Sequence, residues 1–228
     1  MKITKFLSIC AILASAFTFS ACNSETSGTY QTIIFVNYGG TTADGFCQYV
    51  YSDPTGGFSG GSNTGSTITF LSKTIFSEGK TPAIGTRLIG QFTITLGEEL
   101  KNGTILDNSG IAGLSKFGNV DIETLDAAPQ SNPIYIQSLL PSGKYLDIVA
   151  LAASQNSDLR LVCDQSSLNS DTAVLYLVYE CNALDAVETQ YFASFDLSSV
   201  LNLTNIKNIK LVANSSNGSS EYTFPVKQ

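Results

Sequence analysis

Short apolar stretches, separated by segments rich in Gly, Ser, Asn and Pro, recur along the whole chain. Several of them alternate between apolar and polar positions, as in residues 86–96, where single Thr residues separate Phe92, Ile94 and Leu96. Such alternation places successive side chains on opposite faces of a β-strand, whereas helical spacing is scarce here. The pattern therefore predicts an all-β chain.

The predicted strands form two groups. The first group lies at residues 30–38, 46–51, 67–76, 86–96, 104–106 and 115–125. The second group lies at residues 134–139, 145–152, 158–163, 173–179, 190–196, 208–213 and 221–226. The spacings in the second group are typical of an immunoglobulin-like β-sandwich, and residues 198–203 are expected to form a single helical turn between strands.

Residues 127–133 separate the two groups and contain two prolines, Pro129 and Pro133, but no large apolar side chain. This composition predicts a linker. Removing the first 21 of the 228 residues leaves 207, which exceeds the usual length of one domain, about 100–150 residues. We therefore expect a first β domain at 30–126 and a β-sandwich at 134–228, with one large sandwich as the alternative.

The N-terminus carries a separate apolar run, Phe6 to Phe19, behind Lys2 and Lys5. The run is too short to cross a membrane and has the flanks of a cleaved signal peptide, so residues 1–21 are assigned to a signal. The small residues before Cys22 resemble a bacterial lipoprotein signal, which predicts that Cys22 receives the lipid (palmitate) and that residues 22–29 form a tether. Cleavage without lipidation and an uncleaved helix are the alternatives.

Charge and cysteine content limit the partners and the cross-links. The chain has 12 basic and 19 acidic residues; loss of Lys2 and Lys5 leaves 10 against 19, a formal charge of −9. This balance repels phosphates and argues against a nucleic acid partner. After loss of Cys10 and acylation of Cys22, at most one disulfide is possible.

The remaining cysteines are Cys47, Cys163 and Cys181. A hairpin between the strands at 158–163 and 173–179 would place Cys163 opposite about Val174 and not opposite Cys181. We therefore expect no bridge between these two residues.

Two short motifs superficially indicate catalysis or phosphate binding. The residues 57–61 match the hydrolase pattern G-x-S-x-G, in which a His takes the proton of the Ser, but the chain has no His. The glycines at 60 and 65 have the spacing of a phosphate-binding loop but lack the Lys that contacts the phosphates. Neither motif predicts a catalytic residue or a cofactor.

Metal chemistry has little support. Cys163 and Cys181 are too far apart in sequence for a typical zinc site, so no metal is predicted. Asp121 and Glu123 lie two positions apart and share a strand face, where they can converge on a hard cation or form a glycosidase-like pair. A solvated strand edge is the simpler interpretation.

The segment 52–66 is rich in Gly and Ser and poor in apolar groups, which predicts a mobile loop. Its one large apolar side chain, Phe58, has no local core to join and is therefore a candidate binding residue. Other aromatic residues of the first half, such as Tyr49, are expected to fill a core or, alternatively, to form a platform for sugars or bases.

The second half of the chain resembles a known protein family. The segments Asn132-Pro133-Ile134-Tyr135-Ile136, Ser142-Gly143-Lys144-Tyr145-Leu146-Asp147-Ile148 and Tyr222-Thr223-Phe224 resemble those of the NigD-like lipoproteins of the Bacteroidales. The resemblance implies an OB-like barrel at 30–126 before the sandwich, and Asp147 stands where the family usually has Asn. Asp171-Thr172-Ala173 matches the O-glycosylation pattern of exported proteins in the phylum to which the Bacteroidales belong, so Thr172 is a possible modification site.

Three function classes follow. The leading hypothesis is a non-enzymatic protein of a Gram-negative cell envelope, anchored in the outer membrane by its lipid, that binds a protein or glycan through its β domains. Whether it faces the periplasm or the cell surface stays open. The alternatives are self-protection against a bacteriocin, which the family name suggests, and a carboxylate-dependent hydrolase.

Overall fold

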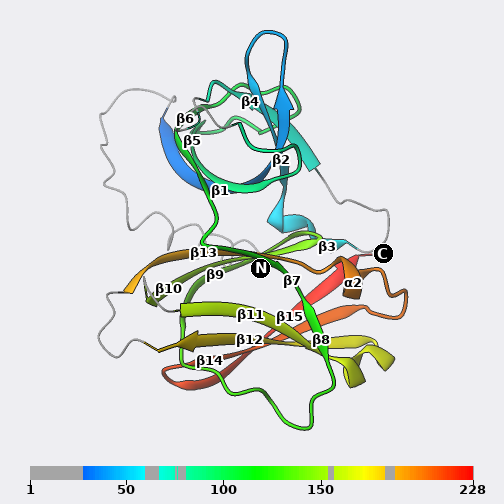
Figure 1. Cartoon of the computed structure of the whole chain (residues 1–228). Helices are drawn as coiled ribbons and strands as arrows, with labels where there is room; N and C mark the ends of the chain where they lie inside the picture. The colour runs from blue at the N-terminus through cyan, green and yellow to red at the C-terminus, as the bar shows by residue number, and fades with distance from the viewer. Residues whose placement is uncertain are drawn as a thin grey trace. The chain divides into compact units, whose positions relative to one another are not determined.

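The computed structural model describes residues 28–59, 67–74, 76, 81–153, 157–182 and 188–227. In these residues the chain is all-β, with two sheets, neither of them closed, so the predicted fold class is confirmed at this level. The chain divides into two compact units (Figure 1). Unit 1 comprises Met1–Tyr51 and Thr69–Ala112, and unit 2 comprises Ser52–Ile68 and Gly113–Gln228.

Unit 1 contains one sheet of order β4-β2-β1-β5-β6. Its strands are β1 (Thr29–Thr41), β2 (Cys47–Ser52), β4 (Thr67–Ser72), β5 (Arg87–Thr95) and β6 (Asp107–Gly113). The long central strand β1 pairs antiparallel with both β2 and β5. Val36 and Tyr38 are buried on either side of the less buried Asn37, as a period of two requires. The two residues before Val36, Ile34 and Phe35, are both buried.

The core of unit 1 is aromatic. Tyr49, Phe70 and Phe92 are fully buried, and the ring centroids of Phe70 and Phe92 lie 4.8 Å apart at 86°. A Cβ atom at Gly90 would lie 2.4 Å from the Phe92 ring, so only glycine leaves room for this ring. The prediction that Tyr49 fills a core is therefore confirmed.

Unit 2 contains a ten-stranded sheet of order β7-β13-β10-β9-β3-β15-β14-β12-β11-β8. Its strands are β3 (Gly57–Ser59), β7 (Lys116–Asn119), β8 (Asp121–Glu123), β9 (Tyr135–Gly143), β10 (Tyr145–Ala153), β11 (Ser157–Asp164), β12 (Thr172–Cys181), β13 (Glu188–Asp196), β14 (Asn208–Ser215) and β15 (Gly218–Lys227). Its short helical segments are η1 (Pro54–Gly56), η3 (Gln165–Asn169) and α2 (Ser198–Leu201). The helix α2 confirms the predicted helical turn. Within the described residues, no helix has the length and apolar character needed to cross a membrane.

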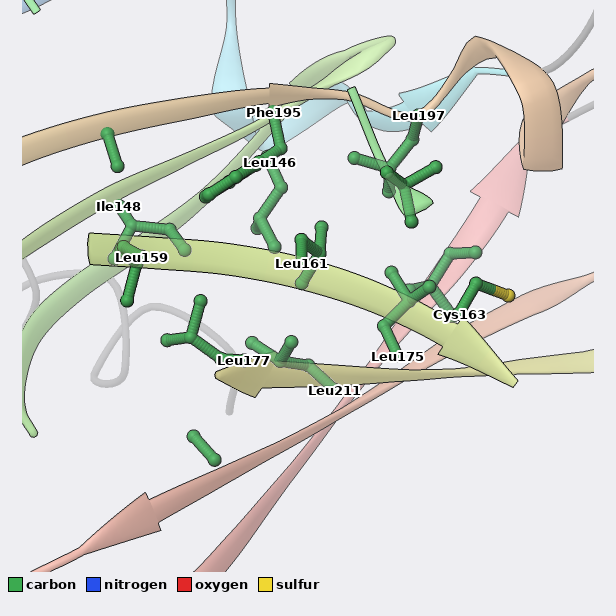
Figure 2. Close-up of a cluster of buried hydrophobic side chains, with 14 of the residues drawn as sticks. Leu146, Ile148, Leu159, Leu161, Cys163, Leu175, Leu177, Phe195, Leu197 and Leu211 are labelled. Atoms are coloured by element: carbon green, nitrogen blue, oxygen red, sulfur yellow. The ribbon is translucent and has the colours of Figure 1, made fainter. Parts of the chain in front are cut away.

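The two halves of this sheet enclose one hydrophobic core (Figure 2). In the half containing β10, Leu146 and Ile148 point into the core, and β11 and β12 contribute Leu side chains from the other half. The core-facing residues of these two strands include Leu159, Leu161, Leu175 and Leu177, all essentially inaccessible to water. Their alternation along each strand explains why the second group of strands was predictable.

Strand β3 lies between the two halves. It pairs in parallel with β9 through Gly57 and Phe58, and with β15 through Phe58 and Ser59. Phe58 is 0% exposed and packs edge-on against Phe224 at 5.7 Å between ring centroids. The prediction of Phe58 as an accessible residue of a mobile loop is therefore wrong, because its core is supplied by strands distant in sequence. The rest of that segment, 60–66, lies outside the described residues.

The opposite ends of the sheet are strands β7 and β8, which follow each other directly in sequence. Strand β7 pairs in parallel with β13, β8 pairs in parallel with β11, and Val120 between them is buried in the shared core. Residues 113–126 thus pack with unit 2, as does 52–59, so the division of the chain differs from the predicted boundary at 127–133. The predicted single strand at 115–125 is split at Val120.

We expect Phe58→Ala to lower the free energy of unfolding by about 3–5 kcal/mol, because it empties a closed position between the two halves of the sheet. The matched control is Phe117→Ala, since Phe117 is 52% exposed and its loss should cost no more than about 1 kcal/mol. Urea unfolding of the chain from Asn23 onward measures both. Equal small losses for the two variants would contradict the assignment of Phe58 to the core.

Candidate functional site

The sequence singled out Cys22, Phe58 and Thr172 as candidate site residues. Cys22 and the residues before it lie outside the described part of the chain. Phe58 is enclosed in the core of unit 2 and offers no surface to a partner. Thr172 is half-buried at the start of β12, and its hydroxyl donates a hydrogen bond to Oδ1 of Asp171 at 3.0 Å.

The cysteines of the described residues are free thiols: Cys47, Cys163 and Cys181. In the β11–β12 hairpin Cys163 pairs with Leu175, one residue from the predicted Val174, and Cys181 pairs with Ser157. Burial raises the pKa of Cys163 to about 11. At neutral pH this side chain is a protonated thiol, which is a poor nucleophile.

The carboxylates of Asp121 and Glu123 share a face, as predicted, but they meet a cation there. Nη1 of Arg160 lies 3.9 Å from Asp121 and 3.5 Å from Glu123, and Nη2 lies 3.6 Å from Glu180. All four side chains are well exposed. Among the described residues, no cluster of three or more Cys, Asp or Glu side chains is arranged to hold a metal ion.

The predicted linker is instead hydrogen-bonded into the sheet. The parallel pairing of β12 with β14 ends at Leu177 and Ala213. Beyond this point residues 131–134 fill the space between the two strands. Asn132 N–H donates to the carbonyl of Tyr179 at 2.8 Å, Tyr179 N–H donates to Oγ of Ser131 at 2.9 Å, and Ile134 N–H donates to the carbonyl of Asn214 at 3.0 Å.

Two grooves in unit 2 flank this segment. Groove 1, of about 730 Å³, lies beside residues 128–133 and is lined by Tyr176 and Glu180 of β12 and by Asn214 of β14, among others. Groove 2, of about 210 Å³, lies beside the start of β9 and is lined by Tyr135, Tyr222 and the turn that joins β14 to β15. Groove 1 has the size of an ordinary ligand site, about 300–1,000 Å³.

The β14–β15 hairpin separates the two grooves. Asn214 and its cross-strand neighbour Ser219 line groove 1, whereas Ala213 and its neighbour Ser220 line groove 2. Successive side chains of a strand point to opposite faces, so the grooves lie on opposite faces of the hairpin. They are two sites and not parts of one cleft.

A buried carboxylate lies elsewhere in unit 2. Asp147 of β10 is 0% exposed, and its two oxygens accept hydrogen bonds from the hydroxyls of Ser194 at 2.6 Å and Ser142 at 2.7 Å. These residues come from β13 and β9, the two neighbours of β10. Each carboxyl oxygen of Asp147 therefore has a hydroxyl donor, and the two bonds join three strands.

Sequence reasoning missed both grooves. Tyr135, Tyr176 and Tyr222 lie in or beside predicted strands, but nothing local to them shows that they border a groove. The one available signal was the pair Ser131 and Asn132, whose side chains can hydrogen-bond the backbone of a strand end. The linker prediction rests on the two prolines and the lack of a large apolar side chain, which give no sign of these hydrogen bonds.

No protein-family model matches the chain, and no curated protein matches it. Solved structures, in contrast, do match the chain. A protein of unknown function from Bacteroides vulgatus superimposes with a TM-score of 0.60 at 15% identity, covering 87% of this chain and 92% of that one. A candidate lipoprotein from Bacteroides fragilis gives 0.52 at 12% identity, covering 88% and 98%. A NigD-like immunity protein from Bacteroides caccae gives 0.50 at 13% identity, covering 89% and 94%.

At these identities the comparisons establish a shared fold. They include a NigD-like protein and a candidate lipoprotein, both from Bacteroidales. The resemblance to NigD-like lipoproteins that the sequence indicated is therefore confirmed at the level of the fold.

We expect Asp147→Leu to lower the free energy of unfolding by about 3 kcal/mol, because two buried serine hydroxyls lose their acceptor. The control, Asp147→Asn, should cost no more than about 1.5 kcal/mol, since a serine hydroxyl can accept a hydrogen bond from the new amide as well as donate one. Chemical unfolding compares the two. An Asn variant as unstable as the Leu variant would show that both carboxyl oxygens are required.

Proposed function

We propose that this chain is a lipid-anchored protein of a Gram-negative cell envelope that binds a protein or glycan partner and catalyses no reaction. The small residues before Cys22 support the anchor, and the outer membrane is the expected site. The observation that carries the binding role is groove 1, because its wall is a segment that hydrogen bonds fix to β12 and β14.

The composition of groove 1 favours recognition of a large partner. Tyr176 offers a half-buried aromatic surface, Gln130 and Asn132 offer amides, and Glu180 supplies one carboxylate. Binding energy at protein surfaces concentrates in a few aromatic and hydrogen-bonding groups that a rigid frame holds in place. A wall held by backbone hydrogen bonds loses little conformational entropy when a partner binds.

The finer fold assignment is part of the proposal. Unit 1, with five strands around an aromatic core, suits an OB-like barrel, which is a five-stranded and only partly closed architecture. Unit 2, with two halves of a sheet around one core, suits an immunoglobulin-like sandwich with added edge strands.

Self-protection against a bacteriocin is the second candidate. It is favoured by the shared fold of the NigD-like immunity protein from Bacteroides caccae and by the excess of acidic over basic residues, which attracts a basic partner. Deletion of the gene separates the candidates. Sensitivity of the deleted strain to a toxin of its own species supports protection, and unchanged sensitivity supports another partner.

We expect Tyr176→Ala to weaken capture of the partner from envelope extracts by about 30-fold, the loss typical of an aromatic hot spot. Tyr30→Ala is the matched control, because Tyr30 is 42% exposed and belongs to unit 1. Quantitative mass spectrometry of proteins and glycans retained on the immobilised chain measures both. Equal retention by the two variants would refute binding through groove 1.

The absence of catalysis is tested separately. We expect the purified chain to show no turnover on panels of ester and glycoside substrates, because the carboxylates of Asp121 and Glu123 face Arg160. A turnover that Asp121→Asn or Glu123→Gln abolishes would support the hydrolase instead, while Lys73→Gln, which leaves both carboxylates in place, serves as the control.

A further inference from the structure

Groove 2 is an opening in the seam between the two halves of the sheet of unit 2. Strand β3 bridges β9 and β15 only at their ends, at Ser142–Gly143 and at Val226–Lys227. The starts of β9 and β15 have no such bridge from β3. In Figure 1 both strands run on beyond the short β3, and groove 2 is lined by residues from this part of the seam.

The floor of the groove is apolar and its rim is aromatic. Ile134, Ile136 and Ala213 form the apolar lining, of which Ile134 and Ala213 belong to the core. Tyr135 is 61% exposed and Tyr222 is 37% exposed, although both are large rings. Two strands far apart in sequence thus place tyrosines on one small groove, whereas most tyrosine surface in a folded chain is covered.

The remaining lining consists of hydroxyl and amide groups on an ordered turn. Oγ of Ser215 donates to the carbonyl of Gly218 at 2.8 Å and accepts from Asn217 N–H at 3.4 Å. Gly218 has a φ of 103°, which favours glycine. The turn therefore holds Ser216, Asn217 and Ser220 in place at the edge of the groove.

None of the residues that line groove 2 is charged. A charged ligand would lose its water there without gaining a countercharge. A neutral sugar ring has an apolar C–H face that stacks on aromatic rings, and hydroxyls that bond with Ser and Asn side chains. At about 210 Å³ the groove is smaller than sites that enclose a drug-sized ligand, about 300–1,000 Å³, so it suits one ring of a longer chain.

We propose that groove 2 is a subsite for a neutral saccharide, in which Tyr135 and Tyr222 stack on a sugar ring and the β14–β15 turn binds its hydroxyls. This site is separate from groove 1, so it stands or falls independently of the function proposed above. A polypeptide strand is the competing occupant, since it would extend the seam by backbone hydrogen bonds and would depend little on the two rings.

The test uses the full chain in detergent and a set of neutral oligosaccharides of glucose, mannose, galactose and N-acetylglucosamine. Binding is followed by saturation-transfer NMR and calorimetry, with polygalacturonate as the charged comparison. We expect at least one neutral oligosaccharide to bind, and Tyr135→Ala and Tyr222→Ala each to weaken it by about tenfold or more. Both side chains are exposed, so the variants should fold, and their thermal unfolding confirms this.

Two controls separate ring stacking from other effects. Tyr135→Phe and Tyr222→Phe keep the rings and should retain binding within about threefold, whereas Tyr176→Ala alters groove 1 and should leave sugar binding unchanged. The proposal is overturned if no neutral oligosaccharide binds, if polygalacturonate binds equally well, or if both alanine variants bind like the original chain. Binding of an unstructured peptide that the alanine variants preserve would assign the seam to a polypeptide.

Discussion

One hydrophobic core, shared by the two halves of a folded sheet, is the constraint on which unit 2 depends. Each buried Leu or Ile adds about 1.5–3 kcal/mol, but a core between two halves is open to water along both seams. Strand β3 covers part of one seam with Phe58, and Val120, which joins β7 to β8, covers the other. Phe58 and Val120 both precede residue 134, where the predicted sandwich begins. The sandwich therefore cannot be complete without residues from the earlier part of the chain.

Hydrogen bonds then fix the surface that surrounds this core. The carboxylate of Asp147 joins three neighbouring strands, and residues 131–134 occupy the space where β12 and β14 separate. Ordering such a segment costs about 1–2 kcal/mol for each residue, which these bonds offset. The segment between the two grooves is consequently held in place by the sheet itself.

The sequence predicted what depends on local alternation and missed what depends on distant pairing. Alternating Leu and Ile gave the strands of residues 134–228, and the helical turn at α2 was also predicted. Phe58 was misassigned because its neighbours in sequence are Gly and Ser, while its core partner Phe224 lies far along the chain. The same reason explains why the partner strands of β7 and β8 and the two grooves were not predicted, since each joins segments that no local pattern connects. Asp121 and Glu123 show an intermediate case: their shared face was predictable, but Arg160 opposite them was not.

The β14–β15 hairpin gives the chain two different surfaces from one element. On one face Asn214 and Ser219 border a groove with a carboxylate, and on the other Ala213 and Ser220 border a groove with no charge. The acidic chain repels polyanions at long range, whereas a neutral ligand experiences no such field. Alternation along two paired strands therefore allows one rigid hairpin to serve ligands of different chemistry without either site constraining the other.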